Sequence, residues 1–486
     1  MKTWQDIIKG INIKQLIGKI PQKVSAICFD TRQVVKDSVF VAQKGTKVDG
    51  HQFVNQAIDA GAICVVVEVI PENIRENVCY IQVENSSLVL AIMADNFYDH
   101  PSQKLRLVGI TGTNGKTTTV TLLYRLFLSM GKKVGLLSTI ENRINEEVIP
   151  STHTTPDSVK INEMLAKMVD AGCEYCFMEV SSHAIVQNRI SGLHFTGALF
   201  SNITHDHLDY HKTFAQYRDA KKLFFDNLPA TAFALTNLDD ANGIVMLQNT
   251  VAKKYTYSLN NAACDFKAKI IECNIEGTQL RIAGDDVWFR LVGKFNSYNL
   301  LAIYATSVLL GIDKHLVLLK MSLLEAAEGR FFTMRGKNVT VIVDYAHTPD
   351  ALQNVLETIN AVSKPEQEII TVVGCGGDRD KTKRPEMAKI ACKLSNRVVL
   401  TSDNPRTEDP NKILTDMEKG VSAAYEPTTL VIPDRKQAIK SAIVQAKNNS
   451  IVLIAGKGHE KYQDINGVKH HFDDVEEAQK YIKEYD

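Results

Sequence analysis

Residues 105–118 read LRLVGITGTNGKTT, so a hydrophobic run leads directly into a glycine-rich turn that ends in lysine and two threonines. In this layout, backbone N–H groups and a helix N-terminus point at one anion, Lys116 reaches the outer phosphates and the Thr117 hydroxyl can bind Mg²⁺. The usual pattern has glycine at position 110, where this chain has isoleucine. The stretch predicts a loop that binds a nucleoside triphosphate. The alternative is an ordinary glycine turn between a strand and a helix.

The size and charge of the chain limit what it can be. Its 486 residues predict about three domains, because one domain usually has ~100–200 residues. Lysine plus arginine and aspartate plus glutamate balance at 56 each, so there is no electrostatic reason to expect nucleic acid or an anionic membrane as a partner. No apolar run has the length of a membrane span or a signal peptide, which predicts a cytoplasmic protein without membrane insertion.

The nine cysteines are scattered through predicted strands and have the pattern of small buried hydrophobic residues. Cys173 and Cys176 form a CxxC pair, but no second pair follows at the spacing of a zinc ribbon. Cys375 lies in a predicted loop, and no residue at a characteristic spacing from it could act as the general base that a nucleophilic cysteine needs. We therefore expect the cysteines to be structural and unpaired.

Alternating strands and helices predict an α/β protein with three domains, at residues 1–101, 102–330 and 331–486. The first has short β-rich runs and a helical stretch near 53–60, and His100-Pro101-Ser102 ends a helical segment at its boundary. The second contains the phosphate loop, a helix that stops at Gly131, and a β-rich insertion over about 250–292. The third alternates strands with helices around 350–361, 385–394, 411–424 and 435–447, which is a Rossmann-like pattern.

The central part also contains candidate metal ligands. Glu179 ends a predicted strand, at the edge where α/β sheets place their sites, and could hold Mg²⁺; the alternative is a solvated glutamate. The segment THDHLDYH at 204–211 could form a zinc site, but a two-metal phosphoryl-transfer site with one imidazole ligand fits the nearby loop better. Lys221 and Lys222 lie in a predicted helix, and such a pair alone is typical of a solvated face.

Three loops of the last part follow predicted strands and should meet at one edge of its sheet. They are GCGGDRDKTKRPEM at 374–387, SDNPRTEDP at 402–410 and AGKGHEKY at 455–462. Their side chains supply both signs of charge as well as amide groups, which suits a zwitterionic amino acid. The candidate ligands are Arg379, Asp403, Asn404, Arg406 and Glu460. The alternative for Arg406 is that it braces its own loop against Glu408 or Asp409.

Taken together, the motifs resemble those of the Mur ligase family over essentially the whole chain. They are DTRQV, KGTKVDGHQF, TGTNGKTT, THTTPD, EVSSHAIVQNR, HDHLDYH, YRDAKKLFF, GKFNSYNLLA, the GR at 329–330, DYAHTPDAL, CGGDRDKTKRP, DNPRTEDP and GKGHE. The resemblance implies a small α/β UDP-binding domain, a central P-loop ATPase with a parallel sheet, and a C-terminal Rossmann-like amino-acid domain.

The resemblance also implies three ligand sites. The ATP-binding residues are Gly112, Thr113, Asn114, Gly115, Lys116, Thr117, Thr118, Asn296, Asn299, Arg330 and Asp344. The residues for the UDP-linked substrate are Thr31, Thr154, Thr155, Ser181, Gln187 and Arg189, and Thr31 keeps the hydroxyl of the serine that relatives carry. The residues for meso-diaminopimelate are Arg379, Asp403, Asn404, Pro405, Arg406, Gly456 and Glu460.

For catalysis, the resemblance implies roles for Lys116, Glu179, His207 and Lys221. Glu179, His207 and the Thr117 hydroxyl are the implied magnesium ligands. Lys221 is similar to the lysine that family members carry as a carbamate derived from CO₂, an anion that supports a second Mg²⁺. This replaces the solvated-face expectation for Lys221 but leaves it in place for Lys222. Lys212 stands where relatives often have glycine, and the sequence gives no reason for it.

The activity implied is ATP-dependent addition of meso-diaminopimelate to UDP-N-acetylmuramoyl-L-alanyl-D-glutamate through an acyl phosphate, in peptidoglycan synthesis. The expected partners are these small molecules and ATP, and the expected state is a monomer. The alternatives within the family are a lysine-adding ligase and a ligase similar to folylpolyglutamate synthetase. The alternatives outside it are a P-loop motor or GTPase switch and a binding module without activity. No Walker-B strand or switch region supports a motor or switch.

Overall fold

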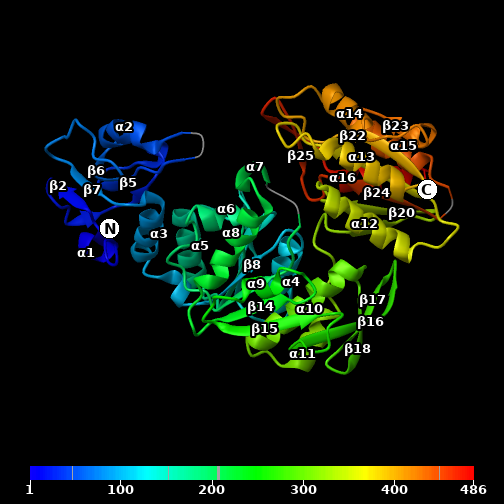
Figure 1. The fold of residues 1–486 in the computed structure, drawn as a ribbon, viewed down its shortest axis with the longest axis horizontal. Helices are drawn as coiled ribbons and strands as arrows, with labels where there is room; N and C mark the ends of the chain where they lie inside the picture. Colours follow the sequence, from blue (N-terminus) through cyan, green and yellow to red (C-terminus); the bar gives the residue numbers. More distant parts are fainter. Residues whose placement is uncertain (46–47, 152, 205–207, 448, 486) are drawn as a thin grey trace.

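The computed structural model describes the whole chain except residues 46–47, 152, 205–207, 448 and 486. Figure 1 shows three α/β units in chain order, with the central unit between the other two. The predicted class, a mixed α/β protein of three domains, is confirmed. His207, the predicted magnesium ligand, lies outside the described residues. No helix in the described part of the chain is long and apolar enough to cross a membrane.

The first unit is a five-stranded sheet covered on both faces. Its order is β2 (Gln15–Ile17), β7 (Cys79–Gln82), β6 (Ala62–Val67), β5 (Ser38–Val41) and β4 (Ile27–Cys28), all parallel except β2. Alternate side chains of these strands pack against α3 (Ser86–Phe97) on one face and α2 (Val54–Asp59) on the other. The short β1 (Lys2–Thr3), β3 (Lys23–Val24) and α1 (Trp4–Ile7) complete this unit.

The central unit is built on an eleven-stranded sheet. Seven neighbouring strands are parallel: β9 (Val134–Leu137), β12 (Tyr175–Glu179), β8 (Arg106–Thr111), β13 (Gly197–Phe200), β14 (Phe233–Asn237), β15 (Lys253–Ser258) and β16 (Phe266–Asn274). Antiparallel strands close both ends, namely β10 (Glu141–Ile144) and β11 (Glu147–Pro150) at one and β17 (Gly277–Ile282) and β18 (Asp285–Phe289) at the other.

The helices of the central unit cover both faces of this sheet, because its strands are apolar on both sides. On one face α4 (Lys116–Ser129), α10 (Lys294–Leu309) and α11 (Lys314–Met321) share a core with Val108 and Ile110 of β8. On the other face α5 (Ser158–Asp170) and α8 (Phe214–Asp226) pack with Leu107 of β8. Shorter helices are α6 (Ser182–Val186), α7 (Leu208–His211) and α9 (Gly243–Met246).

The third unit is a six-stranded sheet in the order β19 (Phe332–Arg335), β20 (Val339–Asp344), β24 (Ser450–Ala455), β21 (Ile369–Cys375), β22 (Arg397–Ser402) and β23 (Thr429–Val431), parallel except β19. One core contains α12 (Pro349–Val362), α13 (Lys383–Leu394) and α14 (Pro410–Glu418), and the other contains α15 (Arg435–Val444) and α16 (Asp474–Tyr485). A hairpin, β25 (Tyr462–Ile465) and β26 (Val468–His471), stands beside them.

Two details differ from the sequence-based expectations. The β-rich segment over 250–292 is not a separate insertion, because β15 pairs with β14 and its strands extend the central sheet. Helix α14 ends at Glu418 instead of continuing to 424. After the helix the chain passes close to Pro385 at Gly420, where a Cβ atom would lie 1.9 Å from the Pro385 carbonyl oxygen, so this position requires glycine.

Candidate active site between the central and C-terminal sheets

One cavity of about 980 Å³ joins the central and third units. Its central side is the carboxyl end of β8, β12 and β13 with the loops that follow them. Its other side is formed by the loops after β20, β21, β22 and β24. In parallel α/β sheets, ligands bind at this edge. The predicted convergence of the three C-terminal loops is confirmed, and they also face the phosphate loop.

The predicted phosphate loop forms the turn between β8 and α4, and two of its glycines are required by close packing. Gly112 has φ +151°, and a Cβ there would lie 2.0 Å from Oγ of Ser201. Gly115 has φ +85°, and a Cβ there would lie 2.5 Å from Oδ1 of Asn299. The turn therefore brings backbone close to side chains of two other segments, as a phosphate cradle needs.

Lys116 and Lys221 lie together beside this loop. Lys116 Nζ donates to the carbonyl oxygens of Gly112 at 2.9 Å and Thr113 at 2.8 Å, and Lys221 Nζ donates to Gly112 at 2.8 Å. Lys221 is 1% exposed, and its Nζ lies 4.6 Å from the centre of the Tyr217 ring. A buried lysine of helix α8 thus contacts the phosphate loop.

The expectation that Lys222 lies on a solvated face is wrong. This residue is only 9% exposed, and its Nζ forms an ion pair with Asp226 at 2.7 Å, one helical turn away. Most of the circumference of α8 is covered, since Tyr217, Ala220 and Phe224 are buried as well. The solvated face of α8 is formed instead by Ala215, Gln216, Asp219 and Leu223, and neither of the two adjacent lysines lies on it.

Glu179 is fully buried at the end of β12, which excludes the solvated alternative. Its Oε1 accepts the backbone N–H of Thr139 at 2.8 Å, whereas its buried Oε2 has no hydrogen-bond partner among the described residues. A carboxylate oxygen without a partner is a suitable ligand for a hard cation such as Mg²⁺. The described residues contain no group of three His, Cys, Asp or Glu that could hold a metal.

Only some of the residues predicted for the UDP-linked substrate line the cavity. Thr154 and Ser181 line the cavity. Thr155, Gln187 and Arg189 form a network behind them, in which Arg189 donates to the Thr155 carbonyl at 2.8 Å and to Gln187 Oε1 at 2.6 Å. The described lining of the cavity does not include Thr31, which stands in a 3-10 turn of the first unit, Thr31–Gln33.

Of the predicted nucleotide residues beyond the loop, Asn296 and Asn299 are buried on α10, and Arg330 is half-buried at the start of the third unit. Asn299 lines the cavity and donates to Asn296 Oδ1 at 3.2 Å. Arg330 donates to the Thr117 hydroxyl at 3.1 Å, and its guanidinium lies 4.7 Å from the centre of the Tyr345 ring.

Asp344 lies behind Arg330, at the end of β20. Its Oδ2 accepts the N–H of Phe331 at 2.7 Å, and burial raises its pKa to about 6. Burial outweighs the opposing effects of the Arg330 charge and the backbone hydrogen bonds on this pKa. Asp344 therefore links the strand end to the segment that joins the two units.

Three of the predicted amino-acid residues, Asp403, Asn404 and Glu460, meet around Lys457, which was not predicted from the sequence. Lys457 is fully buried, and its Nζ lies 3.0 Å from Asn404 Oδ1, 3.3 Å from Glu460 Oε2 and 3.9 Å from Asp403 Oδ1. Asn404 also donates to Glu460 at 2.7 Å. Burial, and then the nearby Asp403 charge, raise the pKa of Glu460. The only sequence signal for Lys457 was its place in GKGHE, between two glycines after a strand.

Gly456 and Arg406 both have a positive φ, and each makes a close contact within the C-terminal loops. A Cβ on Gly456, at φ +119°, would lie 2.5 Å from Oδ2 of Asp403. Arg406 has φ +52°, and its Nη1 donates to the carbonyl oxygen of Gly377 at 2.6 Å. Glu408, the alternative partner proposed for Arg406, is bound by Arg384 instead. Arg379 is exposed and lines the cavity, while Pro405 is buried.

A second group missed by sequence reasoning is Asp350, at the start of α12. Its Oδ2 accepts from Nδ2 of Asn114 at 2.8 Å and from the Thr204 hydroxyl at 3.0 Å. This carboxylate of the third unit thus holds the phosphate loop of the central unit. Lys212 has φ +60°, a backbone conformation that glycine adopts without strain.

All nine cysteines are free thiols, as expected, and six of them are buried. Burial raises the pKa of Cys375 to about 12, so its thiol stays protonated at neutral pH. Burial also raises the pKa of Cys173 and of Cys176.

Comparison with known proteins agrees with the geometry. Three family models match successive parts of the chain: the catalytic domain of the Mur ligase family at residues 23–98, the Mur ligase middle domain at 110–307 and the Mur ligase glutamate ligase domain at 329–458. A three-domain α/β fold with a phosphate loop facing a charged C-terminal pocket defines the class as a nucleotide-using ligase. The chain belongs to the Mur ligase family.

Its relatives include UDP-N-acetylmuramoyl-L-alanyl-D-glutamate–2,6-diaminopimelate ligases. The protein of that name from Cytophaga hutchinsonii is 58% identical over 472 residues, which is 97% of each chain. The one from Phocaeicola vulgatus is 52% identical over 473 residues, covering 97% of this chain and 98% of the relative. A solved structure of a ligase with this name has a TM-score of 0.71 at 34% identity and covers 99% of both chains.

Proposed function

We propose that this protein is the ATP-dependent ligase that adds meso-diaminopimelate to UDP-N-acetylmuramoyl-L-alanyl-D-glutamate. The observation that carries the proposal is the single cavity in which the phosphate loop, the acyl-donor side at Thr154 and Ser181, and the charged pocket around Asp403 and Arg406 all meet. The identity to the diaminopimelate ligases supports the choice of amino acid. We place the enzyme in the cytoplasm as a monomer, with domains at 1–101, 102–330 and 331–486.

The reaction needs an activated carboxylate, because a carboxylate itself does not acylate an amine. The γ-carboxylate of the D-glutamate residue attacks the γ-phosphate of ATP, which forms an acyl phosphate and releases ADP. The amine of diaminopimelate then attacks the acyl carbon, and phosphate leaves from the tetrahedral intermediate. Lys116 neutralises the charge that develops on the transferred phosphoryl group. Gly112 to Thr118, with Asn296, Asn299, Arg330 and Asp344, hold the nucleotide.

The buried Oε2 of Glu179 and the hydroxyl of Thr117 would hold Mg²⁺, with His207 as a further ligand of the family pattern. Bound there, Mg²⁺ would neutralise phosphate charge during the transfer. Lys221 carries the carbamate in this proposal: its neutral amine adds to CO₂, a new N–C bond forms, and one proton goes to solvent. Its support is that a buried lysine lies against the phosphate loop.

The UDP-linked substrate lies between the first and central units in this proposal. Thr154 and Ser181 face the cavity, and Thr155, Gln187 and Arg189 fix them from behind. Thr31 contacts the nucleotide end of the substrate in the first unit. In this arrangement the substrate spans two units, and its reacting carboxylate reaches the phosphate loop.

The amino acid lies in the third unit. Asp403 and Glu460 bind an ammonium group, and Arg379 and Arg406 bind carboxylates, with Asn404, Pro405 and Gly456 shaping the pocket. Meso-diaminopimelate has one more carboxylate than lysine at its far end. A guanidinium can bind that carboxylate with two parallel hydrogen bonds, so Arg406 is the residue that selects it.

The test is phosphate release from ATP with the UDP-dipeptide and either amino acid, together with the mass of the product. We expect release that depends on meso-diaminopimelate and a product one diaminopimelate residue heavier. Equal incorporation of L-lysine would replace the proposal with the lysine-adding ligase. Release that depends on neither amino acid would refute it.

A further inference from the structure

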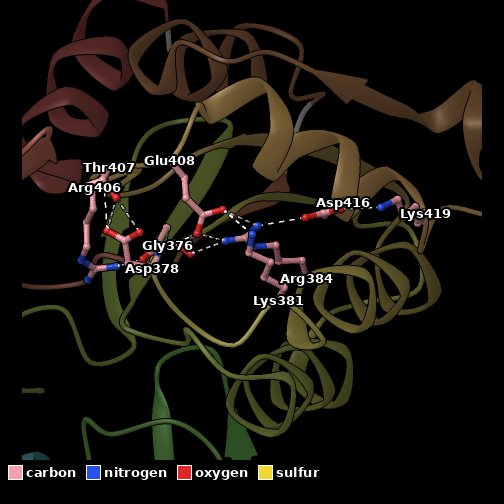
Figure 2. Close-up of polar contacts among 10 residues, drawn as sticks. Gly376, Asp378, Lys381, Arg384, Arg406, Thr407, Glu408, Asp416 and Lys419 are labelled. Atoms are coloured by element: carbon pink, nitrogen blue, oxygen red, sulfur yellow. Dashed lines mark hydrogen bonds and ion pairs between the residues drawn. The ribbon is translucent and has the colours of Figure 1, made fainter. Parts of the chain in front are cut away.

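Arg384 is a buried arginine at the start of α13 that binds three separate segments. It is 1% exposed. Its Nη1 donates to Glu408 Oε2 at 3.1 Å and to Asp416 Oδ2 at 3.0 Å, while Nη2 donates to Glu408 Oε1 at 2.9 Å and to the carbonyl oxygen of Gly376 at 3.4 Å. Figure 2 shows Arg384 between Glu408 on one side and Asp416 on the other. No role in the reaction described above uses this residue.

Glu408 is the point at which two loops are joined. It lies at the end of the loop 403–408 and accepts the backbone N–H of Asp378 at 2.6 Å, in the loop 376–380. Arg384 and this N–H hold the pKa of Glu408 at about 2, and the arginine has the larger effect. The side chain of Asp378 returns the contact by accepting from the Thr407 hydroxyl at 2.8 Å. Each loop therefore holds the other.

The two loops pack closely against each other at two glycines, Gly376 and Gly377. A Cβ on Gly377 would lie 1.9 Å from the carbonyl oxygen of Pro405, and one on Gly376 would lie 2.8 Å from Nη1 of Arg406. Arg406 Nη1 itself donates to the Gly377 carbonyl oxygen at 2.6 Å. Because Arg406 is fixed on the loop that Arg384 anchors, a shift of that loop moves the Arg406 guanidinium.

We propose that Arg384 is a positioning residue for amino-acid selection: through Glu408 it locks the loop 403–408 to the loop 376–380 and so fixes the guanidinium of Arg406 in the pocket. The inference rests on the proposed function, because it assigns Arg406 to the distal carboxylate of diaminopimelate. The geometry requires arginine at 384. A planar guanidinium can bind two carboxylates and one carbonyl at once, whereas the single ammonium of lysine cannot reproduce the two parallel bonds to Glu408.

Two variants test this, Arg384→Lys and Glu408→Gln, with Glu368→Gln as the matched control. Glu368 forms a similar two-bond pair with Arg397, at 2.6 Å for each bond, but at the opposite end of β21 and β22. We expect both test variants to raise the KM for meso-diaminopimelate by about 10-fold or more, and to lower its preference over L-lysine by a similar factor. The KM values for ATP and the UDP-dipeptide should stay within about 2-fold, as should all three in the control.

Amide hydrogen exchange of the protein without substrates measures the mobility of the two loops independently of which amino-acid substrate the enzyme uses. Arg384→Lys should speed exchange in 376–380 and 403–408, and leave the phosphate loop unchanged. If exchange in these loops is unchanged, or if the KM values for all three substrates rise together, the positioning role is wrong. If the wild type does not use meso-diaminopimelate while the exchange effect is present, the proposed function fails and the anchoring of the loop by Arg384 stands.

Discussion

Lys116 and Lys221 donate to the same acceptor, the backbone carbonyl of Gly112, over distances of 2.9 and 2.8 Å. One lysine comes from the start of α4 and the other from the middle of α8. Two ammonium groups that share an acceptor repel each other. Conversion of Lys221 into an anionic carbamate would remove this repulsion and place an oxygen ligand beside the phosphate loop, which is the physical reason to expect the modification here.

The first prediction separates Lys221 from its neighbour. Lys221→Ala should lower the ligation rate by several orders of magnitude, and formate or acetate in excess should restore part of it, since either supplies the missing carboxylate. Lys222→Ala is the matched control. It breaks the ion pair with Asp226 and should lower stability by roughly 1–3 kcal/mol, between the values for exposed and buried pairs, while keeping the rate. A damaged rate in the control with a normal rate in Lys221→Ala would reverse the assignment.

The second prediction concerns Lys116. Lys116→Ala should slow phosphoryl transfer by about 10²–10³-fold, the usual effect of removing one group that stabilises charge in the transition state. Binding of the UDP-dipeptide should not change, because Thr154 and Ser181 belong to other elements. Calorimetry without ATP measures this binding. A weaker UDP-dipeptide complex would show that Lys116 serves both substrates.

The third prediction concerns selection of the amino acid by Arg406. The wild type should prefer meso-diaminopimelate over L-lysine by at least ~10²-fold, because the ammonium of lysine would face an unpaired, partly buried guanidinium. Arg406→Ala should remove most of that preference. Competition assays with both amino acids decide it, and unchanged selectivity in the variant would mean that Arg406 only supports its loop.

The fourth prediction concerns Lys457. Lys457→Met leaves Asp403 and Glu460 buried without their cation, so unfolding should cost roughly 3–5 kcal/mol less and the KM for the amino acid should rise. Lys461→Met is the control, because Lys461 is 56% exposed and its short ion pair, at 2.9 Å, is with the exposed Glu328, whereas the buried Asp473 lies 3.9 Å away. It should change stability by at most about 1 kcal/mol. Urea denaturation of both variants makes the comparison, and equal losses would exclude a special role for Lys457.

The fifth prediction concerns Asp344 and pH. Its pKa in the folded protein is about 6, against an ordinary value of 3.8, so the folded state binds the proton more tightly than the unfolded state. Its contribution to stability is therefore complete below pH 3.8 and is lost as the pH rises through 6. Relative to Asp344→Asn, the free energy of unfolding of the wild type should fall by up to about 3 kcal/mol between pH 4 and 7. A difference that does not vary with pH would place the pKa of Asp344 at its ordinary value.

The sequence by itself determined the class of fold, the phosphate loop and the loops of the third unit. Local patterns suffice for these features. The glycines at 112 and 115 indicate a tight turn, and a loop that directly follows a strand must lie at the carboxyl edge of the sheet. The place of the strands over 250–292 depended on a distant contact, the pairing of β15 with β14.

Only the tertiary structure decided which charged groups meet. Lys221 and Lys222 are adjacent in sequence, yet one reaches the phosphate loop and the other reaches Asp226. The contact of Asp350 with Asn114 spans 236 residues, and that of Lys457 with Asn404 spans 53. No local periodicity encodes such pairs, because the energy of a buried charge depends on the groups that folding places around it.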